Sequence, residues 1–401
     1  MMKISKEAFK CCSACGGSDL ELIADMPQFP HIGIFIDDPK EAEKSPLVDN
    51  SLYACSFCGH VQLGYAVDPA FLYTTDFQHK TSESVSAKQA NDFLYDFATK
   101  ICANAKLELV AEVGCNDTFL LQKFAEKGID VAGVDPIIKG REDKFLDGLP
   151  RNLLDKFHVF GDFVENVDFT ASVGKSPDLY VTNFVFEHIQ DPCAVAEAIL
   201  DRAKPDAIVI IGVPGAEFLL HNCRFDQLSH QHYQQFTIPS LSHMVERAGG
   251  EILDIQCNFT NWGQILIAFK KGPKKTPKSV DVAFTVPQVK ASFAAFQDQL
   301  DFLKRRVDSL SSKPVYGVGA AQNFPVFAYF YGDDLPFDVI LDDHPLRQNK
   351  MYPHVPVKIE KPNKLYGGAV GVLSASDYGR VLVGRMTQLG FDHILLPFTS
   401  L

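Results

Sequence analysis

The sequence lacks an excess of basic residues, and this absence narrows the range of possible partners. Its 401 residues include 38 Lys and Arg against 50 Asp and Glu, for a formal net charge of −12. Nucleic acids and anionic membranes usually bind a basic protein face. The acidic balance therefore argues against both kinds of partner.

Long apolar runs are missing as well. No stretch approaches the ~20 apolar residues that span a bilayer, and the N-terminal segment MMKISKEAFKCC reaches two cysteines before any apolar core. Neither a membrane-spanning helix nor a secretory signal peptide is therefore expected. We expect a cytoplasmic protein whose cysteines stay reduced.

Internal repeats and low-complexity tracts are absent too. The composition is that of an ordinary folded protein, with 46% hydrophobic and 22% charged residues. Because a single hydrophobic core stops growing at roughly 250–300 residues, the length predicts two or three domains.

Four cysteines form two closely spaced pairs, Cys12 with Cys15 and Cys55 with Cys58. Two intervening residues let both thiolates of a pair point at one ion across a tight turn. Four thiolates complete a tetrahedral Zn²⁺ site with no open position. The pattern predicts a structural zinc ion in an N-terminal domain over residues 1–75.

A redox dithiol and four buried free thiols remain alternatives to the zinc site. Cys11 and His60 are further possible ligands. The other cysteines are scattered, and we expect them to be small core residues: Cys102, Cys115, Cys193, Cys223 and Cys257.

Strand and helix patterns alternate through the middle of the chain, which predicts a parallel, doubly wound sheet in an α/β fold. The predicted strands cover 107–113, 130–135, 158–160, 179–183 and 207–213, and the predicted helices cover 92–104, 117–127 and 194–203. Ligands of such sheets bind at the carboxyl ends of the strands. We expect this domain to extend over residues 76–272.

Three of these strand ends carry residues suited to a nucleoside cofactor. Glu112, Gly114 and Asn116 end the first strand, where a glycine lets the backbone approach a ligand closely. Asp135 ends the second, about 20 residues further on, where an acid can accept hydrogen bonds from a ribose. Asp162 and Phe163 follow the third and place a carboxylate and an aromatic ring near an adenine.

The glycine motif lacks the last glycine of a dinucleotide fingerprint, because Thr118 occupies its place. An acid before the first glycine suits S-adenosylmethionine better, since that cofactor has no pyrophosphate and carries a cationic amino-acid group. We therefore predict S-adenosylmethionine as the cofactor. Each acid alone could instead be a helix cap or a solvated loop charge.

A polar break near 273–277 separates a C-terminal domain, which we expect over residues 273–401. It begins with a long amphipathic helix near 286–311, which could pack between domains or bind a partner. A strand, a glycine turn and a helix follow from Pro314, and buried strands are predicted near 339–343 and 369–374. These patterns predict a second, smaller α/β domain.

Taken in order along the chain, these motifs resemble the sugar C-methyltransferases, which methylate a carbon beside the keto group of a nucleotide-linked hexose. The resemblance covers nearly the whole chain and is carried by the paired cysteines and by the segments EVGCNDTFLL, GVDP, VTNFVFEHIQDP, FDQLSHQH, VYGVGAAQN and LDDHPLRQNKMYPHVPV. It implies a Rossmann-like methyltransferase domain between a zinc-binding module and a smaller α/β domain.

The resemblance also implies roles for particular residues. His232 would remove the acidic proton beside the ketone, and His188 would donate to the resulting enolate, as such a reaction requires. Asn183 and Phe184 would line the cofactor. Each histidine could instead be an ordinary structural residue.

This sequence departs from the family on the substrate side. Ser229 and Gln231 stand where the family has Tyr and Glu, His79 stands where a tyrosine is usual, and Leu266 replaces an arginine. We expect His79, His230 and Gln231 to face the substrate nonetheless. The departures favour a methyltransferase whose acceptor differs from the usual one.

The resemblance further implies that the C-terminal domain helps to hold a sugar nucleotide. Asn323 and Asp343, near the glycine turn at Gly319, are candidate contacts, because a glycine turn entering a helix offers unpaired N–H groups to a phosphate. A turn with no ligand is the alternative. Transfer to oxygen or nitrogen of another carbohydrate, and a non-catalytic binding protein, also remain open.

Overall fold

The computed structural model describes residues 5–68, 72, 80–259, 263–275 and 281–398, and the chain folds into two compact units. The first unit comprises 1–21, 53–218 and 231–286, and the second comprises 22–52, 219–230 and 287–401. The units are described separately below. The division into three domains stays a prediction.

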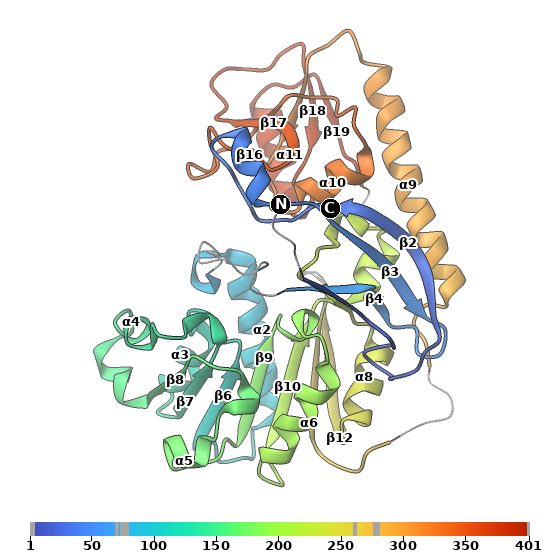
Figure 1. Cartoon of the computed structure of the whole chain (residues 1–401). Helices are drawn as coiled ribbons and strands as arrows, with labels where there is room; N and C mark the ends of the chain where they lie inside the picture. The colour runs from blue at the N-terminus through green and yellow to red at the C-terminus, as the bar shows by residue number, and fades with distance from the viewer. Residues whose placement is uncertain (1–4, 69–71, 73–79, 260–262, 276–280, 399–401) are drawn as a thin grey trace. The chain divides into compact units, whose positions relative to one another are not determined.

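A seven-stranded sheet forms the centre of the first unit (Figure 1). In spatial order it consists of β12 (Gly250–Asn258), β13 (Gln264–Lys271), β10 (Ile208–Val213), β9 (Leu179–Asn183), β6 (Leu109–Val113), β7 (Asp130–Val134) and β8 (Phe157–Phe160). Strands β6 to β10 are parallel, whereas β13 runs antiparallel to β10 and β12. Because the chain proceeds outward from β6 to β8 and then returns to β9, the strand order reverses between β6 and β9. Ligands of open α/β sheets bind beside that point.

Helices cover both faces of this sheet because its strands are apolar on both sides. Leu109, Ala111 and Val113 pack on one face in a core that includes α6 (Pro192–Arg202) and α8 (Ile238–Arg247). Val110 packs on the other face with α2 (Val85–Ile101) and α3 (Phe119–Ala125). Two shorter helices lie in this unit, α4 (Glu142–Leu146) and α5 (Phe169–Val173), and the chain passes into the second unit within α7 (Ala216–His221).

Additional short strands surround the cysteine segment. β1 (Lys6–Ala8) pairs antiparallel with β5 (Tyr65–Val67), and β4 (Val61–Leu63) pairs antiparallel with β11 (Gln234–Gln235). The chain enters the second unit within β2 (Leu20–Phe29) and returns within β3 (Val48–Cys55).

The second unit contains a six-stranded sheet, so the predicted second α/β domain is confirmed. Its order is β16 (Met351–Tyr352), β17 (Val355–Glu360), β15 (Val339–Leu341), β14 (Val315–Val318), β18 (Val370–Leu373) and β19 (His393–Leu395). The helices are α10 (Phe324–Tyr331), α11 (Gly379–Gln388) and most of α9 (Val286–Asp308).

The first helix starts earlier than the sequence pattern predicts. We expected it near Asp92, but α2 begins at Val85, where the hydroxyl oxygen of Ser84 accepts a hydrogen bond from the amide of Ala87 at 3.3 Å. Ala87 and Ala90 are buried, so the apolar side of the helix begins before the strongly hydrophobic residues. Among the residues that the structure describes, no helix has both the length and the apolarity needed to cross a bilayer.

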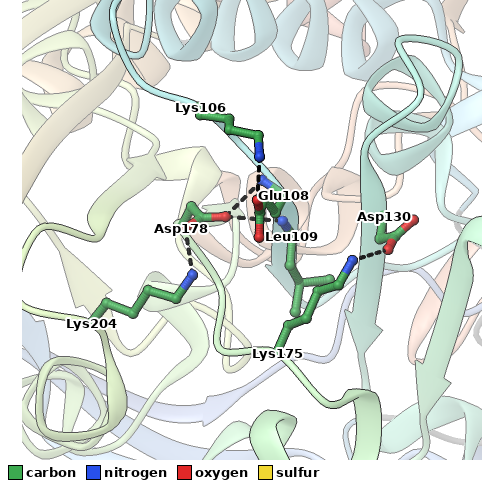
Figure 2. A network of polar contacts seen from close by, with 7 residues as sticks. All are labelled: Lys106, Glu108, Leu109, Asp130, Lys175, Asp178 and Lys204. Carbon is green, nitrogen blue, oxygen red and sulfur yellow. Dashed lines mark hydrogen bonds and ion pairs between the residues drawn. The ribbon is translucent and has the colours of Figure 1, made fainter.

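Lysines and carboxylates bind together the amino ends of the central strands (Figure 2). One oxygen of Asp178 accepts hydrogen bonds from the amides of Glu108 and Leu109 at 2.7 and 3.1 Å, and the other accepts from Lys204 at 2.6 Å. Asp130 accepts from Lys175 at 2.6 Å. This network fixes the start of β6 against the loop that leads into β9.

We predict that Asp178→Asn lowers the stability of the first unit by about 1–2 kcal/mol at pH 7, the range for a charge-assisted hydrogen bond. Burial alone would raise the pKa of Asp178, but hydrogen bonds from Lys204 and the two amides lower it below its usual value. Such a carboxylate stabilises the fold above its unfolded pKa and ceases to do so as pH falls through the folded value.

Chemical unfolding at pH 7 and pH 3 tests this expectation. The variant and the wild type should differ at pH 7, and the difference should shrink as the pH is lowered to 3. The exposed Asp206→Asn serves as control, because that side chain lies outside the network drawn in Figure 2. An equal deficit at both pH values would contradict the role assigned to the Asp178 charge.

Candidate active site and cysteine metal centre

The four predicted zinc ligands converge on one point. Cys12 Sγ lies 3.6 Å from Cys58 Sγ, and Cys15 Sγ lies 3.7 Å from Cys55 Sγ. All four sulfur atoms lie within 4.8 Å of one another. With Zn–S bonds of ~2.3 Å, a tetrahedral site places its sulfurs about 3.8 Å apart, so the cluster fits a structural Zn²⁺.

The two alternative ligands lie elsewhere. Both ring nitrogens of His60 contact other side chains, Nε2 with Gln234 Oε1 at 2.9 Å and Nδ1 with Ser240 Oγ at 3.3 Å. Cys11 is exposed and does not belong to the cluster. The cysteines pack in the same core as α6 and α8, so the metal centre supports one face of the large sheet.

The turn after β6 has an unusual backbone. Gly114, Asn116 and Thr118 all have positive φ angles, +74°, +44° and +61°. A Cβ at Gly114 would overlap with Val185, so only glycine fits there. Thr118, at the place of the missing glycine, adopts the left-handed conformation that glycine usually provides. The turn therefore keeps its shape without the full fingerprint.

Asp135 joins this turn to the end of β7. One carboxylate oxygen accepts a hydrogen bond from the amide of Asn116 at 3.1 Å, and the other accepts from the amide of Ile137 at 3.0 Å. Burial nevertheless raises the pKa of Asp135, because these two amides only partly offset the cost of removing its charge from water.

Glu112 is a buried acid with an unsatisfied oxygen. Its side chain is 5% exposed, and Oε2 has no hydrogen-bond partner among the described residues. Burial raises its pKa well above the usual value, and Asp117 and Asp135 raise it further. A positively charged ligand beside Glu112 would relieve this cost. The observation fits the cationic amino-acid part of S-adenosylmethionine.

The remaining predicted cofactor residues follow the adjacent strands. Asp162, after β8, accepts hydrogen bonds from Asn166 and from the amide of Phe163, and these lower its pKa. The ring of Phe163 is 59% exposed. After β9, Asn183 accepts from Gln264 at 2.9 Å, and Phe184 has a φ of +56°. Because β8, β7, β6 and β9 are neighbours in this order, their carboxyl ends lie along one edge.

The two predicted catalytic histidines meet although 43 residues separate them in sequence. Their ring centroids are 4.8 Å apart in an edge-to-face arrangement. His188 Nδ1 donates to the carbonyl oxygen of Gln231 at 2.7 Å. Burial lowers the pKa of His188 to about 4 and that of His232 to about 3, so both rings are neutral at pH 7.

Glu187 completes this cluster, and sequence reasoning overlooked it. Its side chain is 2% exposed, and Oε1 lies 3.9 Å from His188 Nε2. Burial raises its pKa to about 8. The only sequence signal was its position directly before His188, within the segment that carried the resemblance.

Other predicted substrate residues lie in different surroundings. In the second unit, His230 is buried, with Nδ1 3.1 Å from Asn50 Nδ2 and Nε2 3.0 Å from the Phe29 carbonyl oxygen. In that unit Asn323 donates to the carbonyl oxygen of Asp226, and Asp343 pairs with Arg385. The amide of Gln231, in the first unit, donates to the Leu72 carbonyl oxygen at 3.4 Å.

His79 lies outside the described residues. The substrate roles of His79, His230, Gln231, Asn323 and Asp343 stay predictions.

Comparison with known families agrees with this geometry. Residues 84–255 match the family model described as "Methyltransferase domain", and residues 12–73 match the one described as "Putative zinc binding domain". The chain carries an S-adenosylmethionine-dependent methyltransferase domain. The predicted cofactor and the predicted α/β class are thus confirmed.

Individual proteins resemble this chain at low sequence identity. The C-methyltransferase NovU of Streptomyces niveus is 25% identical over 263 residues, which cover 64% of this chain and 59% of that protein. The ubiquinone biosynthesis O-methyltransferase of Neisseria meningitidis is 24% identical over 166 residues, 38% of this chain and 67% of that protein. A solved S-adenosylmethionine-dependent methyltransferase from Clostridium acetobutylicum covers 46% of this chain and 92% of its own, with a TM-score of 0.36 and 13% identity.

We predict that Cys58→Ser lowers the zinc content by one ion per chain and destabilises the first unit, because three thiolates leave one position of the tetrahedral ion open and bind it less tightly. Elemental analysis and thermal unfolding measure both effects. Cys11→Ser, outside the cluster, should leave both unchanged; a similar loss in that variant would refute the ligand assignment.

We also predict that Glu112→Gln weakens S-adenosylmethionine binding by about 10- to 100-fold, the size expected for a lost charged hydrogen bond. The wild-type affinity should rise with pH as Glu112 ionises, and the variant should lose this dependence. Calorimetric titration provides the measurement, with the exposed Glu126→Gln as control. Unchanged affinity at all pH values would remove Glu112 from the cofactor site.

Proposed function

We propose that this protein transfers the methyl group of S-adenosylmethionine to a carbon beside a carbonyl group of a nucleotide-linked sugar in the cytoplasm. The observation that carries the proposal is the meeting of His188 and His232. Val185 packs against Gly114 in the turn after β6, where the cofactor is predicted to bind, and His188 follows Val185 by three residues in the sequence.

Methylation of carbon needs groups that methylation of an acidic oxygen does not. The proton beside a ketone is weakly acidic, so a positioned base and a counter-charge for the enolate both lower the barrier. A pair of neutral imidazoles brought together beside the cofactor suits the first need. In this proposal His232 receives the proton, and the enolate then attacks the sulfonium methyl group.

The tautomer of His188 determines whether this residue can donate a hydrogen bond to the enolate. A carbonyl oxygen can only accept, so the hydrogen bond to Gln231 places a proton on Nδ1. The Phe184 carbonyl is a second acceptor beside the same ring. With the proton on Nδ1, Nε2 would carry a lone pair, and the counter-charge for an enolate would come from another group. The donor role that the resemblance implies for His188 stays a prediction.

Two comparisons bear on the choice of target atom. The C-methyltransferase NovU, which matches the larger share of this chain, favours carbon as the methylated atom. The likeness to an O-methyltransferase favours oxygen as the second candidate. Replacement of the family's Tyr and Glu by Ser229 and Gln231 supports that second candidate as well, because transfer to oxygen needs no enolate.

Deuterium exchange separates the two candidates. A nucleotide-linked 4-keto hexose incubated with the protein in heavy water should exchange the proton at the carbon beside the ketone. We predict that His232→Asn lowers both exchange and methyl transfer by about 100-fold or more, the range for loss of a general base. Mass spectrometry measures both quantities.

The exposed His393→Asn, in the second unit, serves as control and should behave as the wild type. A methylated product formed without exchange would favour transfer to oxygen or nitrogen. Exchange and methylation that survive in His232→Asn would exclude His232 as the base.

A further inference from the structure

Glu187, His188 and His232 form a second group of metal-ligating side chains in the first unit. One ligand atom from each of the three lies within 4.8 Å of the others. The cysteine centre is a separate group with a different donor set. The three residues come from two segments, the turn after β9 and the segment that precedes β11.

The carboxyl group of Glu187 is the observation that points to a ligand. Its Oε2 is buried and has no hydrogen-bond partner among the described residues, and its nearest cationic candidate is the His188 ring at 3.9 Å. A buried carboxylate is costly unless it is paired or coordinates a metal. No lysine or arginine of the described structure forms an ion pair with it.

The hydrogen bond that orients His188 is of the kind found in metal-ligating histidines. Ligating histidines usually donate their second ring N–H to a carbonyl or carboxylate, which fixes the ring and its tautomer. His188 Nδ1 donates to the Gln231 carbonyl at 2.7 Å, so its Nε2 lone pair is the one directed to the side of Glu187. Gln231 directly precedes His232, so the same hydrogen bond ties the two segments together.

The geometry points to a divalent-cation site formed by Glu187, His188 and His232. Around one ion with bonds of ~2.0–2.2 Å, ligand atoms lie about 3–3.5 Å apart, so side-chain rotations of about 1 Å would close the present arrangement. Two imidazoles and one carboxylate suit transition metals such as Mn²⁺, Fe²⁺, Co²⁺ or Zn²⁺ better than Mg²⁺ or Ca²⁺.

The catalytic meaning of this site rests on the proposed function and refines it. A cation there would provide the counter-charge that the Nδ1–H tautomer of His188 does not. Glu187, His188 and His232 would hold the cation, and His232 would then be a ligand and not the base named above. The cation would lower the pKa of a bound water, and that water would supply the base for the acceptor proton. The enolate would form a C–C bond to the methyl group as the S–C bond breaks, leaving S-adenosylhomocysteine.

Cobalt titration of the full-length protein tests the assignment. With zinc already in the cysteine centre, wild-type protein should bind one Co²⁺ per chain and develop visible d–d absorption without the near-ultraviolet bands of thiolate ligands. We predict that Glu187→Gln, which keeps the shape of the side chain, weakens Co²⁺ binding by at least tenfold. His188→Ala should do the same, and Glu126→Gln should bind as the wild type.

Absence of a second metal equivalent in the wild type would overturn the assignment, as would unchanged Co²⁺ binding in Glu187→Gln. If the histidine variant fails to fold, the Glu187→Gln titration alone decides. Methyl transfer that persists when the cysteine centre holds the one metal ion bound per chain would exclude the cation from the reaction and leave the proposed function standing. Cation binding without methylation of any carbonyl-bearing nucleotide sugar would preserve the site and refute the proposed function.

Discussion

The first unit is organised around buried carboxyl groups that the protein itself does not neutralise. Glu112 and Asp135 lie at the turn after β6, and Glu187 lies beside His188. Each has a raised pKa because burial disfavours its charge. Protein folding alone gains little from such groups, so their concentration in this part of the first unit indicates a functional site. At the opposite ends of the strands, by contrast, Asp130 and Asp178 are paired with lysines and stabilise the sheet.

The five parallel strands of the central sheet could be predicted closely because they are continuous apolar runs, whereas β12 and the antiparallel β13 were not predicted. Strand β9 covers the predicted residues 179–183, and the strands around it differ from prediction by a residue or two. The start of α2 could not be found this way. Its first turns bury only small alanines, and its position depends on the Ser84 cap, which a hydrophobic pattern does not reveal.

Part of the candidate site could also be predicted from the sequence, and part could not. Cysteine spacing was sufficient to predict the zinc ligands, because four thiolates within a short segment have few other uses. Glu187 was missed because a carboxylate in a loop is usually solvated, and only the folded structure shows that it is buried and lacks a partner. The surroundings of His230 depend on Phe29 and Asn50, which are about 200 and 180 residues away in sequence, so no local pattern could predict them.

The short ladder between β4 and β11 has an evolutionary consequence. The Gln62 side chain accepts a hydrogen bond from the Ser13 amide in the first cysteine turn, and Gln62 pairs with Gln234, two residues after His232. The amide of Leu63 also donates to the Tyr233 carbonyl oxygen. A substitution that displaces this ladder would therefore disturb both the first cysteine turn and the segment that carries His232. We expect these two distant stretches to co-vary among related sequences, so that grafting a zinc module from one relative onto another requires transfer of the histidine segment with it.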